Sequence, residues 1–257
     1  MPGVKRERCD AVGVLTLDEP ASLNAMTPDL LGDLATAIRE MTDDPEIRAL
    51  VLTGAGRGFC SGQNLKAAQI LGDDIVAGVM RYYWPAFRGL RECRVPVVVA
   101  VNGVAAGGGF SLAMAGDVIV AARSASFIQV FSRIALVPDL GSTWLLPRLV
   151  GRQRALELML MNEPLSAELA CEWGLVREVF DVGSLREGAL ALARKLAAGP
   201  TRALVATRRL IDDSEHATYA DQFRREIETQ AEIRKSADAL EGRNAFLEKR
   251  AARFSGR

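Results

Sequence analysis

Apolar runs separated by glycine-rich loops dominate the first two thirds of the chain. Val95 to Val101 is a continuous apolar run rich in β-branched residues, and Asn102-Gly103 ends it. Arg48 to Thr53 repeats the pattern and leads into another glycine-rich loop. Runs of this length and composition are typical of buried strands. We expect further strands at 11–17, 117–122, 125–130 and 175–180.

Helical periodicity marks the segments between these runs. Thr27-Pro28 is typical of a helix start, because threonine caps the helix and proline fits its first turn. Apolar residues then recur on one face as far as Thr42, which predicts an amphipathic helix. We also expect helices at 73–91, with a break at Trp84-Pro85, and at 152–161 and 166–172.

The character of the sequence changes from Ser184 onwards. Strand patterns vanish, and amphipathic helices rich in arginine and glutamate are expected at 186–198, 201–212, 220–235 and 237–250. Gly199-Pro200 marks a boundary. We therefore predict a core domain over residues 1–198 and a helical region over residues 199–257. Helices this polar often pack on another subunit, although solvated faces account for most of the charges.

Composition narrows the classes of partner and compartment. The chain has 257 residues, and its 32 Lys and Arg balance its 32 Asp and Glu, so neither a nucleic acid nor an anionic membrane is expected. Four widely spaced cysteines and one histidine, His216, disfavour a zinc site and indicate free thiols in a reducing compartment. No apolar segment reaches the roughly 18 residues of a membrane span, and no secretion signal is evident. We predict a cytoplasmic protein.

Two glycine-rich loops follow strands and precede helices. The Gly107 to Gly109 triplet follows one strand, and the segment from Gly54 to Leu65 follows another. The G-x-G-x-G spacing of the latter differs from the dinucleotide fingerprint G-x-G-x-x-G. Glycine allows close approach of the backbone, and a helix start leaves N–H groups unpaired, so both loops could point an N–H at one oxygen. Close packing of a helix on a sheet explains the triplet equally well.

A few side chains are candidates for chemistry. Asp139 has apolar neighbours, and desolvation would raise its pKa from about 3.9 toward values useful for a general base. Alternatively, Pro138-Asp139 is a turn in which Asp139 caps the next helix. Ser111 stands in a near miss to the nucleophile elbow G-x-S-x-G. Its second glycine is absent and His216 lies far along the chain, which favours a structural serine. Cys60 has no nearby histidine and is expected to be a packing thiol.

Several segments recur together in one known family. They are SLNA at 22–25, GFCSGQNL at 58–65, AVNGVAAGGG at 100–109, AMAGD at 113–117, the 138–148 block, ACEWGLV at 170–176 and FLEKR at 246–250. In this order and spacing the chain resembles the enoyl-CoA hydratase/isomerase (crotonase) superfamily over essentially its whole length. The resemblance implies an α/β fold, a crotonase-like spiral of ββα units followed by a C-terminal helical region used for trimerisation. Trimers of the family commonly pair into hexamers.

The resemblance also implies a substrate. Members bind acyl-CoA thioesters and hold the thioester oxygen with two backbone N–H groups, which carry over to Gln63 and Gly108. The family stabilises an enolate there, and such donors are worth on the order of 3 kcal/mol each. CoA belongs to the substrate, and no separate cofactor or metal is implied. The expected partners are the acyl-CoA and further copies of the chain, as a homotrimer or a dimer of trimers.

By the same resemblance, residues at some distance from the thioester bind CoA. The adenine end would lie against the backbone at Ser22, Leu23 and Leu65. Lys249 matches a family lysine that meets the CoA phosphate, often from a neighbouring subunit.

Two departures from the family pattern bear on the reaction. Hydratases of the family use two glutamates, and this chain has Ser111 and Phe131 at those positions. Asp139, directly after Pro138, matches the working aspartate of a branch that includes phenylacetate-pathway ring-epoxide isomerases and enoyl-CoA isomerases. A dehalogenase branch also uses this aspartate but needs a histidine base, and His216 is badly placed for that role.

We therefore predict an acyl-CoA isomerase with Asp139 as its single base, which shifts a double bond or isomerises a ring-containing acyl group. The alternatives are an enoyl-CoA hydratase or thioesterase that uses unrecognised groups, or a catalytically weak acyl-CoA-binding homologue. The sequence does not identify the acyl group. Aromatic residues that either line its pocket or fill the core are Phe59, Tyr82, Tyr83, Trp84, Phe87 and Phe131.

Overall fold

Two β-sheets form the centre of the protein. The computed structural model describes residues 3–65, 70 and 72–257. The larger sheet has the strand order β1-β2-β3-β5-β7-β10, and the smaller has the order β4-β6-β8-β9. All neighbouring strands pair in parallel except β1 with β2 and β8 with β9. Parallel pairing requires helical crossovers, and these are the helices that the sequence places between the strands.

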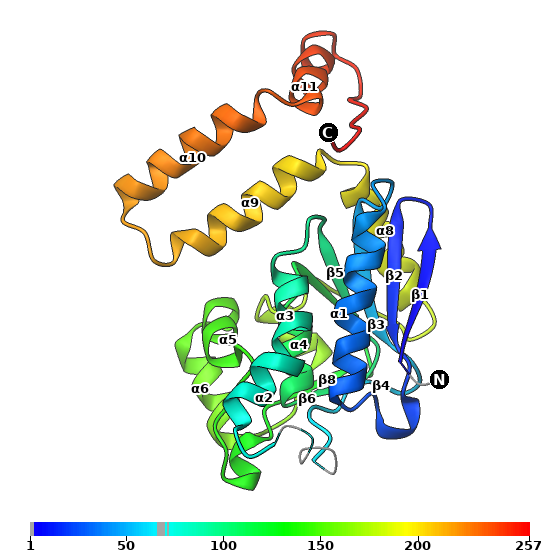
Figure 1. Ribbon diagram of the computed structural model, residues 1–257, viewed down its shortest axis with the longest axis vertical. Coiled ribbons are helices and arrows are strands. Elements are labelled where there is room, and N and C mark those ends of the chain that lie inside the picture. Colours follow the sequence, from blue (N-terminus) through cyan, green and yellow to red (C-terminus); the bar gives the residue numbers. More distant parts are fainter. Residues whose placement is uncertain (1–2, 66–69, 71) are drawn as a thin grey trace.

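The strands alternate between the two sheets along the chain. β3 (Ala49–Gly54), β5 (Val97–Val101) and β7 (Val118–Ala122) enter the larger sheet, and each is followed by a short strand of the smaller sheet. These short strands are β4 (Gly58–Cys60), β6 (Val104–Ala106) and β8 (Ser126–Ile128). Each pair leads into helix, so the chain winds through repeated ββα units (Figure 1). This confirms the predicted fold class.

The remaining elements are β1 (Val4–Cys9), β2 (Val12–Leu17), η1 (Pro20–Ser22), α1 (Pro28–Asp43), α2 (Ile75–Tyr82), α3 (Trp84–Arg91), α4 (Gly108–Met114), η3 (Phe131–Ile134), α5 (Ser142–Val150), α6 (Arg152–Met161), β9 (Leu165–Ser166), α7 (Ala167–Glu172), β10 (Glu178–Phe180), α8 (Leu185–Ala197), α9 (Thr201–Ser214), α10 (Tyr219–Ile233) and α11 (Ala237–Leu247). No helix in the described part of the chain is long and apolar enough to cross a membrane.

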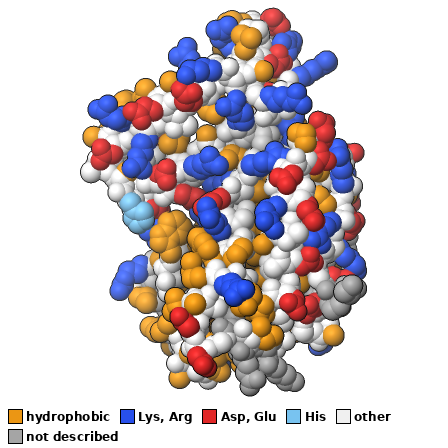
Figure 2. Space-filling view, in the orientation of Figure 1, with side chains coloured by type: hydrophobic (Ala, Val, Ile, Leu, Met, Phe, Trp, Pro, Cys, Tyr) orange, Lys and Arg blue, Asp and Glu red, His pale blue; other side chains and the backbone are white. Residues whose placement is uncertain are grey.

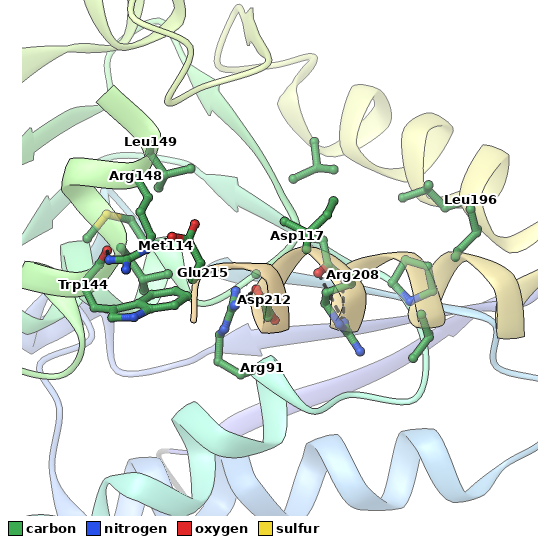
Figure 3. Close-up of a pocket in the computed structure, with 17 residues that line it drawn as sticks. Arg91, Met114, Asp117, Trp144, Arg148, Leu149, Leu196, Arg208, Asp212 and Glu215 are labelled. Atoms are coloured by element: carbon green, nitrogen blue, oxygen red, sulfur yellow. Dashed lines mark hydrogen bonds and ion pairs between the residues drawn. The ribbon is translucent and has the colours of Figure 1, made fainter. Parts of the chain in front are cut away.

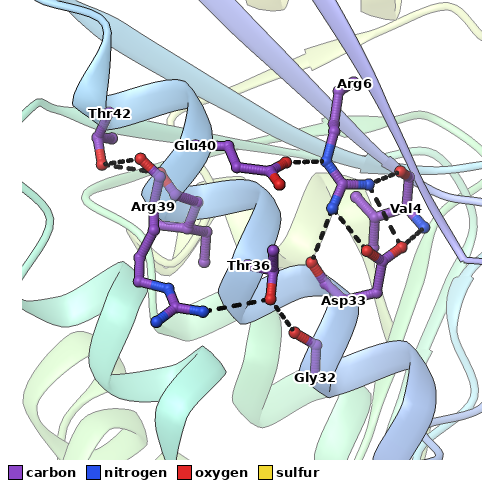
Figure 4. A network of polar contacts seen from close by, with 9 residues as sticks. Val4, Arg6, Gly32, Asp33, Thr36, Arg39, Glu40 and Thr42 are labelled. Carbon is purple, nitrogen blue, oxygen red and sulfur yellow. Dashed lines mark hydrogen bonds and ion pairs between the residues drawn. The ribbon is translucent and has the colours of Figure 1, made fainter.

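β1 is a strand that hydrophobic patterning does not reveal. Four of its six residues, KRER, are charged, because it is an edge strand that faces solvent on one side. Arg6 fixes it to α1 through ion pairs with Asp33 (2.6 Å) and Glu40 (2.8 Å), as Figure 4 shows. The hydrogen bond from Arg6 lowers the pKa of Asp33. The charged residues of β1 therefore break the apolar pattern expected of a strand, and one of them, Arg6, attaches the strand to α1.

Other element boundaries differ slightly from the prediction. The strand expected at 175–180 begins at Glu178, because the N–H groups of Leu175 and Val176 donate to Ala170 O at the end of α7. The last helix ends at Leu247 rather than Arg250, and Lys249 has a positive φ of 55°. The helix break expected at Trp84-Pro85 is confirmed, with α2 ending at Tyr82 and α3 beginning at Trp84.

The C-terminal helices differ in their packing. α8 contacts five strands of the larger sheet, whereas α10 has no buried residue. In Figure 1, α10 and α11 extend away from the sheets. Figure 2 shows basic and acidic side chains interspersed over this face. The predicted boundary between residues 198 and 199 falls in the short connection between α8 and α9. A role of this region in trimer assembly stays a prediction.

Candidate active site

The loop after β4 runs beside the segment that precedes α1. Met26 N–H donates to Gly62 O (2.7 Å), and Asn64 N–H donates to Met26 O (2.9 Å). These two bonds pair Met26 with Gln63 in parallel register. In such a pair the N–H of the opposite residue points away from its partner strand, so the Gln63 N–H faces the other side of the loop.

The glycine triplet lies on that other side. A Cβ on Gly62 would stand 3.4 Å from Gly108 N and 2.7 Å from Ala106 O, so the two loops touch here through their backbones. Gly62 also has a φ of 91°, which disfavours any other residue. The folding of β4 beside β6 therefore brings the predicted donors Gln63 and Gly108 to neighbouring loops.

Gly108 is the first residue of α4. Gly107 caps this helix without a side chain, so the first N–H groups of α4 lack helical acceptors. Neither Gly108 N–H nor Gln63 N–H donates to another backbone group in the described parts of the chain. Two neighbouring unpaired amides, one of them at the positive end of a helix, are suited to bind a developing oxyanion.

Asp139 lies in the loop between η3 and α5. Its carbonyl oxygen accepts hydrogen bonds from Ser111 Oγ (3.1 Å) and from Ser142 N–H (3.0 Å). The next residue, Leu140, reaches α4, because a Cβ on Gly108 would stand 2.9 Å from Leu140 Cδ1. The structure thus places the aspartate-bearing loop directly against the helix that begins at Gly108.

The carboxyl group of Asp139 is bonded to its own backbone, and the residue is exposed to solvent. Partial burial is the larger influence and raises its pKa above the ordinary aspartate value, although the backbone hydrogen bond lowers it. The carboxyl group forms no ion pair with any described residue. Gly141 is the cap residue of α5, and no side chain caps that helix. Asp139 therefore stands in a turn, as one reading of the sequence expected, but its side chain does not cap the helix.

Tyr83 is a polar group that the sequence could not place. It is 2% exposed, and its hydroxyl donates to Met26 O (3.4 Å) beside Gln63. Burial raises the pKa of Tyr83 to about 12, with a further contribution from the negative charge of Asp139, while a hydrogen bond to the Gln63 side chain lowers it. The phenol is therefore neutral at physiological pH and lies close to both Gln63 and Asp139.

The predicted CoA-binding residues fall into two places. Ser22 and Leu23 lie beside the Gln63 loop, because their carbonyl oxygens accept Ser61 Oγ (2.9 Å) and Ser61 N–H (3.0 Å). Leu65, at the end of that loop, is exposed. Lys249 follows α11, which lies at the opposite end of the molecule from β4 and β6 in Figure 1. Within one chain, Lys249 is not brought to the site.

The other candidate nucleophiles lack activating partners. Ser111 is fully buried and bonded to Asp139, whereas His216 is exposed near the connection from α9 to α10 and its imidazole is visible at the surface in Figure 2. Burial raises the pKa of Cys60 to about 12, so its thiol stays protonated. The described residues contain no cluster of His, Cys, Asp or Glu that could hold a metal ion.

A cavity of 420 Å³ lies apart from these groups, between α9 and the core (Figure 3). None of the predicted site residues lines it. Its charges cancel in ion pairs of Arg91 with Asp212, of Arg148 with Glu215, and of Arg208 with Asp117. These pairs attach α9 to the core.

Known proteins resemble this chain along nearly its full length. A family model described as enoyl-CoA hydratase/isomerase matches residues 7–257. The 1,2-epoxyphenylacetyl-CoA isomerase of Escherichia coli is 44% identical over 250 residues, which cover 96% of this chain and 95% of that protein. The mitochondrial enoyl-CoA hydratase of Pongo abelii is 33% identical over 97% of this chain and 86% of its own. The crystal structure of an enoyl-CoA hydratase from Bacillus anthracis superposes with a TM-score of 0.92 at 30% identity, covering 99% of both chains.

Proposed function

The chain belongs to the enoyl-CoA hydratase/isomerase family, and from that premise we propose that it is an acyl-CoA isomerase with Asp139 as its base. The supporting observation is the position of Asp139. Its loop packs on the helix that begins at Gly108, and its carboxyl has a raised pKa and no ion-pair partner among the described residues.

The two positions that carry glutamates in family hydratases favour isomerisation over hydration. Ser111 is fully buried, and its hydroxyl is bonded to the backbone of Asp139 rather than free to hold water. Phe131 is 8% exposed, and its ring packs near Gly107. Neither position offers a carboxylate, so the pair of groups that positions and activates water in hydratases is missing.

The proposed reaction needs one base and two donors. The thioester oxygen lies between the N–H groups of Gln63 and Gly108, and Asp139 removes the proton on the carbon next to the thioester carbonyl. The resulting enolate is stabilised by the two donors, at about 3 kcal/mol each. Asp139 then returns the same proton at the γ carbon, which shifts the double bond without net change in protons. A positioned base typically contributes about 10²–10⁴-fold.

We further propose that the acyl group contains a ring. The Escherichia coli relative is named as an isomerase of 1,2-epoxyphenylacetyl-CoA. The ring of Tyr83 is buried beside Gln63 and its hydroxyl donates to Met26 O, so Tyr83 contributes aromatic packing behind the site rather than a hydrogen bond to the substrate.

CoA binding is proposed to require a second subunit. Ser22, Leu23 and Leu65 would contact the adenine end, and Lys249 would reach the CoA phosphate from another copy, because α11 extends away from its own site (Figure 1). Exposed apolar residues on α10 and α11 supply a surface for a homotrimer or a dimer of trimers, and we propose a cytoplasmic location. These residues are Tyr219, Phe223, Ile227, Phe246 and Leu247.

The deciding experiment offers the purified protein 3-enoyl-CoA, 2-enoyl-CoA and a ring-epoxide acyl-CoA. Double-bond migration or ring isomerisation without water addition is expected. Robust hydration without isomerisation would show that the enzyme is a hydratase. Binding of the thioesters by calorimetry without turnover of any of them would instead identify a binding protein.

A further inference from the structure

The hydroxyl of Ser111 bonds a residue outside its own helix. It lies in α4 and is 0% exposed. A serine inside a helix commonly bonds the carbonyl one turn earlier, but Ser111 Oγ is 3.5 Å from Gly107 O, which is long for a hydroxyl bond. Its distance to Asp139 O, 28 residues away, is 3.1 Å. The single hydroxyl proton therefore binds the Asp139 loop rather than the helix.

The Asp139 loop depends on contacts from outside itself. Leu140 has a positive φ of 51°, a conformation that costs a residue with a Cβ roughly 1–2 kcal/mol. Within the turn, Ser142 N–H donates to the Asp139 carbonyl, and the Ser142 hydroxyl is fixed by Gln129 Nε2 (2.8 Å). From outside the turn, the side chain of Ser111 donates to that carbonyl. This bond and the contact of Leu140 with Gly108 tie the loop to α4.

The short helix α4 thus carries one part of the proposed site, the Gly108 N–H, and contacts another, the Asp139 loop. α4 begins with Gly108, whose N–H is proposed to hold the thioester oxygen, and carries Ser111 less than one turn later. A displacement of about 1 Å between reacting groups can reduce a rate by roughly 10²-fold. A fixed link between α4 and the loop would keep the distance between Asp139 and the Gly108 N–H constant.

We propose that Ser111 is a positioning residue that holds Asp139 at a set distance from the Gly108 donor. The proposal rests on the isomerase function proposed above. In this chain the side chain at position 111 acts on the enzyme's own base, through that residue's backbone, rather than on water. It touches neither CoA nor the reacting atoms.

Kinetics of three variants test the proposal. Ser111→Ala should lower kcat about 10–100-fold with KM for the acyl-CoA within twofold, because the groups proposed to bind CoA are untouched. Ser111→Cys has nearly the same volume and a weak donor, and should give an intermediate loss. Thr42→Val is the matched control, since Thr42 is also buried and its hydroxyl bonds helical carbonyls at the far end of α1. It should lose stability without a change in kcat.

Hydrogen exchange gives a readout that is independent of turnover. Peptides covering 133–141 should exchange faster in Ser111→Ala than in the wild type or in Thr42→Val. An unchanged exchange rate, or a kcat of Ser111→Ala within twofold of wild type, overturns the proposal. Failure of the proposed function looks different: the wild type itself isomerises no acyl-CoA, and exchange alone then decides whether Ser111 fixes the loop.

Discussion

Replacement of Asp139 by asparagine tests the proposed base without disturbing the fold. The amide has nearly the same shape as the carboxylate, and the bonds that position residue 139 go to its backbone carbonyl, from Ser111 and Ser142. The carboxylate has no ion-pair partner among the described residues that the change would leave unpaired. The variant should therefore keep the loop in place and lose only the base.

The expected loss follows from the role of the base. Removal of a general base typically lowers kcat by about 10²–10⁴-fold, which corresponds to about 3–5 kcal/mol of transition-state stabilisation. KM should change little, because the proposed oxyanion donors are the backbone N–H groups of Gln63 and Gly108. Ultraviolet absorbance of the conjugated thioester, followed with 3-enoyl-CoA as substrate, gives both constants.

Stability should move in the opposite direction. Burial raises the pKa of folded Asp139 above its unfolded value, so its contribution to stability is present at low pH and is lost as the pH rises through the folded pKa. At neutral pH the charge then costs stability, and Asp139→Asn should have a Tm equal to or above that of wild type. Asp139 is not the base if the variant keeps more than about a tenth of kcat, or if its activity falls together with a lowered Tm.

Three further predictions concern pH, the oxyanion donors and the attachment of α9. The acid limb of kcat/KM should have its midpoint above the ordinary aspartate pKa, because burial raises the pKa of Asp139 and only its ionised form takes a proton; a midpoint at or below pH 3.8 would contradict this. Gly62→Ala would place a Cβ 2.7 Å from a carbonyl oxygen of β6 and shift the next N–H, so kcat should fall about 10²–10³-fold. The control Gly174→Ala has a similar φ of 82° with nothing within 4 Å, and its kcat should stay at the wild-type value; equal losses in both variants would point to backbone strain alone. Arg208→Met should lower the free energy of unfolding by about 2–3 kcal/mol in denaturant titrations, because the Asp117 carboxylate, whose side chain is 20% exposed, loses its ion-pair partner but keeps the hydrogen bond from Val97 N–H; a change below about 1 kcal/mol would show that the pair is effectively solvated.

Local patterns in the sequence determined much of the architecture. The apolar runs at β3, β5 and β7 are readable because strands buried on both faces admit few polar residues. The helix start at Thr27 is also confirmed, since its side chain accepts from Leu30 N–H (3.1 Å). Features that depend on a few neighbouring residues could therefore be predicted without a structure.

The short strands β4 and β6 and the edge strand β1 could not be predicted from local sequence patterns. β4 and β6 have three residues each, too few for a period to show, and they are strands because they pair with each other. β1 is polar because it lies at an edge and is held by the ion pairs of Arg6. Its partners on α1 lie about thirty residues away, and no local pattern records them.

The candidate site divides in the same way. Motifs in the sequence were enough to name Gln63, Gly108 and Asp139, because each stands in a recognisable segment. The tertiary structure decided that Asp139 does not cap α5, that the Tyr83 hydroxyl bonds Met26 beside Gln63, and that the Ser111 hydroxyl bonds the carbonyl of Asp139. The physical reason is that the partners of a hydroxyl or carboxyl group are the residues that pack against it in the folded chain. Here those residues lie tens of positions away in the sequence.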